Sequence, residues 1–440
     1  FVGLSLSTTL QERIDTDLTI FSIIVLFSSS LFSWEAHYLL TYQALKSFKP
    51  ISNAKTVALE SLESFVQTEK LGLINLLNQI ELVAKKNPNY PPLPSNLLFT
   101  GTNQNYDLAK QFLMSLRLNP DVSAIYILEP KSEKPHFLAA EVSDLPLSTL
   151  TEHAGKDLRK ILPGQKVSPL AVVATGSEEP DHGLDFNLWA DNKSWYKDFY
   201  NFGVQPFGNP LLSFGSQAPF HMGFFHESPI LYVAGAFLKR CYPEYRITQF
   251  TMLSRFAFAT GHPYWGYRFL GNALHYLQDL TQVYHSRVAP DMSVPKLIGI
   301  NLLAMMGFDK LKRNTTQILS NKHLGFESYQ LGFIKNALEN ENDAILKSLA
   351  DESIDKNYGP FSDSYAREVV SKEAYDKAAH VDELIKKALP AYLLDPKVNF
   401  VIKDEPDLFI EVNKNPNKAS AALDEELVNL MGSFGRVISS

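Results

Sequence analysis

The residues best suited to chemistry lie in one stretch, GNALHYLQDLTQVYHSR, at positions 271–287. It contains His275, Asp279 and His285, in the order His-x3-Asp-x5-His. On a helix, side chains four residues apart lie on one face, one turn from each other. Imidazole and carboxylate are typical zinc ligands, so the spacing predicts that His275 and Asp279 reach one metal ion.

A second pair repeats this spacing further along the chain. The segment NKHLGFESY carries His323 and Glu327, again four residues apart. A single pair of this kind is more often a hydrogen-bonded surface pair. Two pairs and a third histidine, His285, favour a polynuclear metal centre instead.

The composition limits what else the protein is expected to do. The chain has 440 residues, of which 45% are hydrophobic and 20% charged, as in ordinary globular proteins with one or two domains. Its net charge of -7 argues against a nucleic-acid binder driven by a basic surface. Cys241 is the one cysteine, so a metal site must be built from histidines and carboxylates.

The N-terminal region resembles a signal peptide. Residues 18–27, LTIFSIIVLF, are too short to span a membrane and suit the apolar core of a signal sequence. Ser33 is a suitable small residue before a cleavage site, although Arg13 is the one basic residue upstream. We predict that residues 1–33 are a signal peptide with an upstream extension and that the secreted chain begins at Trp34. A buried helix is the alternative.

Periodicity predicts a mostly α-helical protein with long functional loops, because alternating strand patterns are nearly absent. Residues 123–130 are expected to form a short strand or a buried turn, and residues 174–220 a long structured loop. Helices are predicted at 34–48, 58–86 as one or two helices, 106–118, 247–258, 264–280, 318–349 with a break, 373–388 and 421–431.

The stretch at 271–287 resembles the metal-binding helix of zinc-dependent bacterial phospholipase C, whose superfamily includes zinc-dependent single-strand nucleases. The resemblance is strongest at 261–287 and 321–329. It implies a multi-helix phospholipase C-like fold with long loops and a trinuclear zinc site. Residues 34–440 would form one large α-rich catalytic domain, with about 60–175 as an inserted subdomain.

The resemblance also implies a ligand set for three zinc ions. One zinc would take Asp181, His221, His275 and Asp279; a second His285, His323 and Glu327; and a third Trp34, His37 and the bridging Asp279. Asp181 would also be the catalytic base. Asp185, His182 and His226 remain alternatives to the assigned ligands. Val283 stands where a proline is usual in the family.

The implied activity is that of a secreted phospholipase C. It would hydrolyse the headgroup phosphodiester of phosphatidylcholine-type lipids to diacylglycerol and a phosphorylated headgroup. The partner would be a phospholipid surface contacted peripherally, with no nucleic acid, and the protein would be a monomer. A single-strand nuclease or nucleotidase on the same zinc site is the alternative. A helical protein with a degenerate site is a third interpretation.

Two segments allow more than one interpretation. Residues 294–308, VPKLIGINLLAMMGF, could dock on lipid, but a buried core helix is favoured because the polar face is thin. The aromatic residues between 189 and 207 could cage a quaternary ammonium group or stack on bases. Simple packing of the loop is favoured, since aromatic side chains dominate buried area.

Overall fold

A computed structural model describes residues 37–102, 106–122, 124–129, 137–139, 158–208, 214–340, 343–351, 361–400 and 408–439. Most of these residues lie in helices and the strands are few and short, which confirms the predicted mostly α-helical class. The predicted signal peptide and Trp34 lie outside the described residues. The inserted subdomain stays a prediction.

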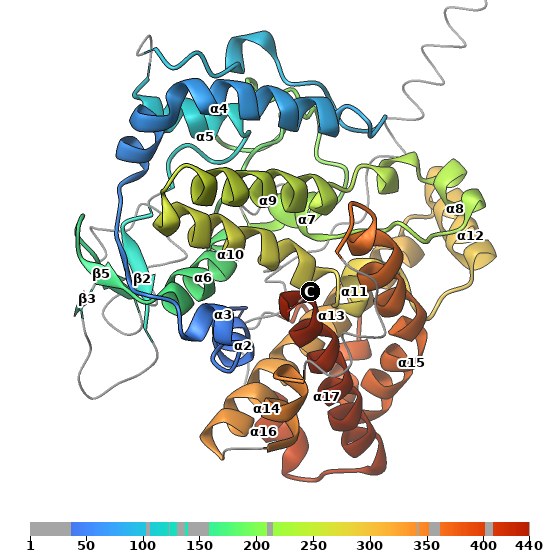
Figure 1. Cartoon of the computed structure of the whole chain (residues 1–440). Coiled ribbons are helices and arrows are strands. Elements are labelled where there is room, and N and C mark those ends of the chain that lie inside the picture. The colour runs from blue at the N-terminus through green and yellow to red at the C-terminus, as the bar shows by residue number, and fades with distance from the viewer. Residues whose placement is uncertain are drawn as a thin grey trace, which may run out of the picture.

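Four helices build the upper part of the molecule in Figure 1. α4 (Leu62–Ala84) and α5 (Leu108–Ser115) form the outer layer, above α9 (Pro243–Ala259) and α10 (Pro263–Asp279). Ser61 caps α4, because its hydroxyl accepts a hydrogen bond from a backbone amide in the first turn. The buried positions of α4 recur every three or four residues, so one face packs into the core.

The polypeptide backbones of α6 (Pro169–Glu178) and α10 touch, and glycine permits this close approach. A Cβ atom added to Gly271 would lie 2.2 Å from the Val173 carbonyl oxygen and 2.8 Å from the Gly176 Cα atom. α2 (His37–Leu45) packs on the other side of α6. The start of α2 is thereby held near the end of α10.

Two buried ion pairs anchor the segment that follows α6. Arg246 of α9 lies 2.6 Å from a carboxylate oxygen of Asp185, and Arg268 of α10 lies 2.6 Å from one of Glu179. All four side chains are buried, and removing one partner would leave an uncompensated charge. The short helix η4 (Glu179–His182) is therefore fixed against α9 and α10.

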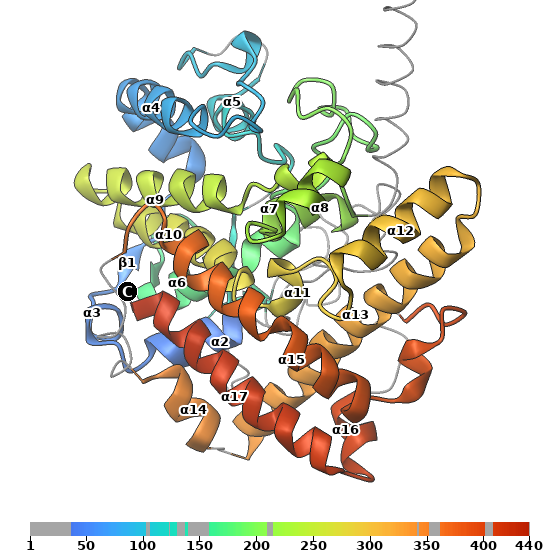
Figure 2. The ribbon, with the colours of Figure 1, turned by 90° about the vertical axis from the view of Figure 1, so that its right-hand side faces the viewer.

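The C-terminal helices form a second hydrophobic core below the first (Figure 1, Figure 2). They are α13 (Lys310–Glu339), α14 (Asp343–Leu349), α15 (Lys372–Ala388), α16 (Leu408–Asn413) and α17 (Lys418–Ser439). α14 and α15 both pack on α17. Helix α13 begins eight residues before its predicted start, and α17 extends beyond its prediction at both ends.

The remaining elements are short. One antiparallel sheet consists of β1 (Val57–Ala58) and β5 (Lys166–Val167). In the other, β4 (Leu158–Lys160) lies between β2 (Tyr126–Leu128) and β3 (Leu138–Ala139) and is antiparallel to both. The short helices are α3 (Lys49–Ser52), η1 (Ser95–Leu97), η5 (Phe214–Gln217), α7 (Ala218–His221), α8 (Pro229–Ala234), η6 (Ala236–Lys239), α11 (Val283–Ser286), α12 (Val294–Met305), the π-helical η8 (Ala366–Ser371) and η9 (Ala391–Leu394).

The favoured interpretation of residues 294–308 as a buried core helix is wrong. They form α12 and the turn after it, and Ile300 is the one buried residue of this helix. Within the described ranges, no helix is both long and apolar enough to cross a membrane. The apolar surface of α12 therefore needs a different explanation.

The predicted long loop at 174–220 is correct only in part. Its first residues complete α6, and short helices occupy both of its ends. Its aromatic side chains mostly pack inside, as expected: Trp189, Tyr196, Tyr200, Phe202 and Phe207 are buried, whereas Trp195 and Phe199 are exposed. This packing leaves little of the aromatic surface for a ligand cage.

Candidate metal centre

Helix α10 supplies the first two candidate ligands as predicted. His275 and Asp279 lie one turn apart at its C-terminal end, and both are fully buried. The Nε2 atom of His275 is 3.3 Å from the Oδ2 atom of Asp279. The i,i+4 spacing therefore places the two groups side by side inside the protein.

Three other elements bring further ligands to Asp279. His37 begins α2, and its Nε2 atom lies 3.3 Å from Asp279 Oδ1. His221 ends α7, and its Nδ1 atom lies 2.8 Å from Asp279 Oδ2. Asp181 of η4 is 3.7 Å from the nearest nitrogens of both His221 and His275. We call these five residues the Asp279 cluster.

A second group lies around Glu327. His323 and Glu327 are one turn apart on α13, with Nε2 and Oε1 separated by 2.8 Å. His285 of α11 places its Nε2 atom 3.8 Å from the same oxygen. All three side chains are buried, and we call them the Glu327 cluster.

Both clusters have the composition and spacing of metal sites. Potential ligand atoms lie within 4.8 Å of one another in three triplets: His37, Asp181 and His275; His221, His275 and Asp279; His285, His323 and Glu327. The structure thus brings together eight of the nine predicted ligands. The ninth, Trp34, lies outside the described residues.

Unsatisfied polar atoms test whether a cation fits these groups. Both carboxylate oxygens of Asp279, the Nε2 atom of His37 and the Nε2 atom of His285 make no hydrogen bond to any described residue. A buried polar group without a partner costs free energy, roughly 1–3 kcal/mol. Nε2 of His275 and Nδ1 of His221 lie at a hydrogen-bond distance of 3.0 Å from each other, whereas the short distances from Asp279 to the imidazoles lack hydrogen-bond geometry. The oxygens of Asp279 therefore suit a cation better than a hydrogen bond.

Burial and neighbouring charges shift the pKa values of the Asp279 cluster in different directions. Burial lowers the pKa of the His37 and His221 imidazoles, but the nearby carboxylates outweigh it and raise the pKa to about 8 and about 10 respectively. Burial lowers the pKa of His275 to about 3. Burial also raises the pKa of Asp181 well above its usual range. For Asp279 the adjacent imidazoles outweigh burial, and its pKa falls well below the usual range.

In the Glu327 cluster, burial is the largest cause of each pKa shift. Burial raises the pKa of Glu327 to about 7 and lowers the pKa of His323 to about 3. The pKa of His285 is also lowered, chiefly by burial. At neutral pH both imidazoles are therefore uncharged, which is the form in which histidine binds a metal.

Metal binding is expected to weaken as the pH falls. A metal must displace the protons that His37, His221 and Glu327 hold near pH 6, so binding releases protons. Zinc affinity should therefore drop by more than about tenfold between pH 8 and pH 6. Isothermal titration in two buffers of different ionisation enthalpy measures the release directly, and buffer-independent heats with a constant affinity would contradict it.

Neighbouring groups orient two of the imidazoles toward Asp279. The Nδ1 atom of His275 donates to the Ser177 carbonyl oxygen at 2.7 Å. The Nδ1 atom of His37 lies 2.7 Å from Gln278 Oε1, and the Gln278 amide donates to the Thr41 hydroxyl. Each imidazole consequently presents Nε2 to the cluster, the arrangement that metal-binding histidines usually show.

The three alternative ligands lie elsewhere. Asp185 is paired with Arg246 and accepts a hydrogen bond from the Tyr276 hydroxyl at 2.6 Å. One of its oxygens lies 3.6 Å from Nε2 of His221, on the side of the ring away from Asp279. His182 lies 3.9 Å from a carboxylate oxygen of Glu178, and His226 contacts the Arg367 carbonyl oxygen. Asp185 thus contacts the far side of the His221 ring and does not lie among the candidate ligands.

Sequence reasoning missed the glutamines that support the clusters. Gln278 contacts His37, Gln217 donates to Asp181 Oδ1 at 3.2 Å, and Gln282 donates to Glu327 Oε1 at 3.2 Å. Gln278 and Gln282 both lie in the 271–287 stretch, next to the ligands. Their position beside the ligands could have indicated a supporting role, whereas nothing in the sequence distinguishes Gln217.

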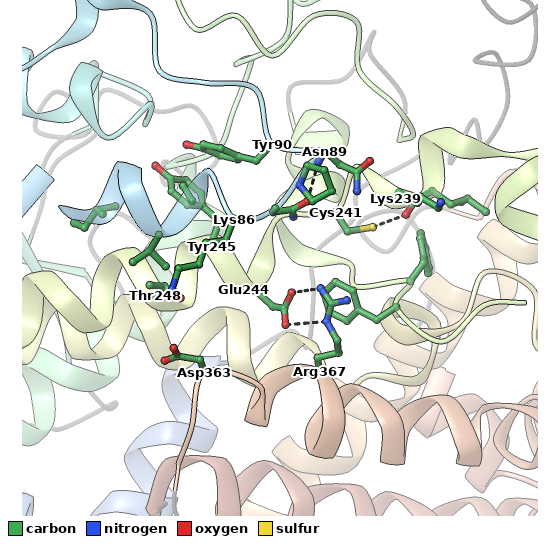
Figure 3. Close-up of a pocket in the computed structure, with 18 of the residues that line it drawn as sticks. Lys86, Asn89, Tyr90, Lys239, Cys241, Glu244, Tyr245, Thr248, Asp363 and Arg367 are labelled. Atoms are coloured by element: carbon green, nitrogen blue, oxygen red, sulfur yellow. Dashed lines mark hydrogen bonds and ion pairs between the residues drawn. The ribbon is translucent and has the colours of Figure 1, made fainter. Parts of the chain in front are cut away.

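A separate cavity of about 530 Å³ opens between α4, α9 and η8. Figure 3 shows the ion pair that Glu244 and Arg367 form in it, beside Cys241 and Tyr245. None of the eight described ligand candidates lines this cavity. The metal chemistry proposed below therefore does not depend on it.

Comparison with known proteins found no relative of this chain. No family model, curated protein or solved structure matches this chain.

Proposed function

We propose that the protein is a zinc-dependent phosphodiester hydrolase, and specifically a phospholipase C. One observation carries the proposal: eight buried histidine and carboxylate side chains from six elements converge in two adjoining clusters. Burying this many titratable groups is costly unless they bind something. Such a concentration is therefore better explained by a metal centre than by packing.

The donor set suits zinc. Five of the eight ligands are imidazoles and three are carboxylates, a mixture that favours zinc over magnesium or calcium. Asp181, His221, His275 and Asp279 would hold one ion, and the Glu327 cluster would hold a second. His37 and Asp279 would hold a third together with the amine and carbonyl of Trp34, if secretion exposes that residue as the N-terminus.

The ligand arrangement supports catalysis rather than a purely structural role. Bound zinc supplies a Lewis acid that lowers the pKa of water and offsets the charge of a phosphodiester. The Glu327 cluster offers three protein ligands, and catalytic zinc sites typically keep one further position open. Structural zinc sites are instead closed by four protein ligands.

Asp181 is the residue we assign as the base. It belongs to the Asp279 cluster but accepts just one hydrogen bond among the described residues, from Gln217. Its carboxylate lies beside the imidazoles of His221 and His275 that would hold the zinc, within reach of a water molecule bound there. Gln217 would keep the carboxylate aimed at the site while Asp181 takes the proton from water.

The phospholipid substrate follows from the resemblance of residues 271–287 to phospholipase C and from Glu327, where the related nucleases tend to carry aspartate. The acidic net charge adds support, because it disfavours a nucleic-acid substrate. The products would be diacylglycerol and a phosphorylated headgroup, released by a secreted monomer.

The test is hydrolysis of phosphatidylcholine by the chain beginning at Trp34, with zinc present and with a chelator. We expect release of phosphocholine that the chelator abolishes and that added zinc restores. Single-stranded DNA serves as the competing substrate under the same conditions. Faster cleavage of DNA than of lipid would establish the nuclease alternative, and inactivity on both with zinc bound would contradict both of these activities.

A further inference from the structure

An exposed apolar surface lies at the tip of the hairpin formed by α12 and α13. Met306 is 71% exposed and Phe308 is 64% exposed. We call the following six exposed side chains the apolar tip: Leu302, Leu303, Met305, Met306, Phe308 and Leu311. Large apolar side chains gathered in this way on a surface usually mark an interaction site.

A defined turn holds this surface open to solvent. Gly307 has a φ of 91°, and its amide donates to the Ala304 carbonyl while the Phe308 amide donates to that of Leu303. These two bonds form a Schellman motif, which ends α12 and turns the chain into α13. Phe308 therefore lies in a turn whose backbone is fixed by hydrogen bonds.

The tip projects from one edge of the molecule. Figure 1 places α12 beside α8 at this edge, and Figure 2 shows the α12–α13 hairpin extending beyond its neighbours. α8, which packs on α12, carries two further exposed apolar side chains, Ile230 and Val233, the latter 86% exposed. A protruding apolar surface such as this tip fits a partner that can deform around it.

Charge at the tip differs from that of the whole chain. Residues 294–313 carry four basic residues and one acidic residue, although the protein has a net charge of -7. Lys296, Lys310 and Arg313 are exposed, and Arg313 pairs with Asp309. Basic groups flanking an apolar surface complement anionic lipid headgroups.

We propose that the apolar tip docks the protein on a lipid bilayer that contains anionic phospholipid. α12 has 12 residues, so it is about 18 Å long and lies in the interface instead of spanning the roughly 30 Å hydrocarbon core. The inference rests on the proposed function, because the docked surface also holds the substrate.

Helix α13 connects the tip to the metal centre. It begins at Lys310, beside the tip, and carries His323 thirteen residues later, about 20 Å along the helix. One continuous helix therefore links the docking surface to the Glu327 cluster. Docking would raise the local concentration of headgroup phosphodiesters around that cluster.

The experiment is co-sedimentation with vesicles of phosphatidylcholine, with and without phosphatidylglycerol. The variants are Met306→Ser with Phe308→Ser at the tip, and Leu71→Ser with Leu82→Ser as control, since these two leucines of α4 are equally exposed. The tip variant should lose roughly tenfold or more in vesicle affinity, because both side chains lose their apolar burial in lipid. The control should bind like the unmodified protein, and all three should melt alike.

Several outcomes separate the explanations. Equal vesicle binding by the tip variant would overturn the inference. So would light scattering that shows a dimer dissolved by the tip substitutions without vesicle binding, because the tip would then join two copies of the chain. Binding is measured with and without chelator, apart from hydrolysis. Vesicle binding without phosphodiesterase activity would therefore refute the proposed function alone, and activity on a soluble phosphodiester without vesicle binding would refute docking alone.

Discussion

The Asp279→Asn variant is expected to lose two of three bound zinc ions and nearly all hydrolytic activity. Asp279 lies within 3.3 Å of three imidazole nitrogens, from His37, His221 and His275. Asparagine keeps the shape of the side chain but removes the negative charge that these ligands surround. We expect the rate of phosphodiester hydrolysis to fall by roughly 10²–10³-fold or more, as when a charge-stabilising group is removed from an active site.

The Glu327→Gln variant is the matched control for this experiment. It makes the same isosteric change in the Glu327 cluster, beside His285 and His323 and outside the Asp279 cluster. It should lose one zinc ion and not two. Zinc per protein is measured by elemental analysis, and circular dichroism verifies folding. Full zinc content and activity in both variants would refute the ligand assignment.

Part of the clustering of the candidate ligands could be predicted because it is local. Within α10 and α13 the i,i+4 spacing alone places His275 beside Asp279 and His323 beside Glu327. The choice between Asp181 and Asp185 as a ligand is instead decided by a contact between distant parts of the chain. It depends on Arg246, 61 residues away from Asp185, which occupies that carboxylate and leaves Asp181 to the cluster. A pairing over such a distance has no periodic signature in the sequence.

The fold shows the same division between local and tertiary information. Helices with strong periodicity were located correctly, and residues 373–388 form α15 nearly as predicted. The exposure of α12 was not predictable from its pattern, because a helix apolar on all sides suits a core and a lipid surface equally well. Its surroundings decide the matter, since mostly α8 and α13 pack against it.

Gly271 links the close packing of the helices to the candidate metal centre. It lies one turn before His275, at the point where the backbones of α10 and α6 meet. The same contact brings the Ser177 carbonyl to His275 Nδ1. The glycine that opens the GNALHYLQD motif is therefore required by packing, whereas the His and Asp residues that follow it form the cluster.

Replacing Gly271 by alanine is accordingly expected to be strongly destabilising. The new Cβ atom would meet backbone atoms of Val173, Gly176 and Ser177 at 2.2–2.8 Å, and backbone cannot rotate away as a side chain can. Overpacking of this kind costs about 3 kcal/mol or more of unfolding free energy. Separating α6 from α10 would also break the Ser177–His275 hydrogen bond, so zinc affinity should fall together with stability.

Gly299→Ala in α12 provides the matched comparison, because no described atom outside its own turns of the helix lies within 4 Å of the added Cβ. Alanine is a better helix former than glycine, so this variant should be more stable by about 0.5–1 kcal/mol and should bind zinc normally. Chemical denaturation of the two variants and the unmodified protein measures the difference. If Gly271→Ala were as stable as Gly299→Ala and kept its zinc, the two backbones could not be in contact, and the link between helix packing and the metal centre would fail.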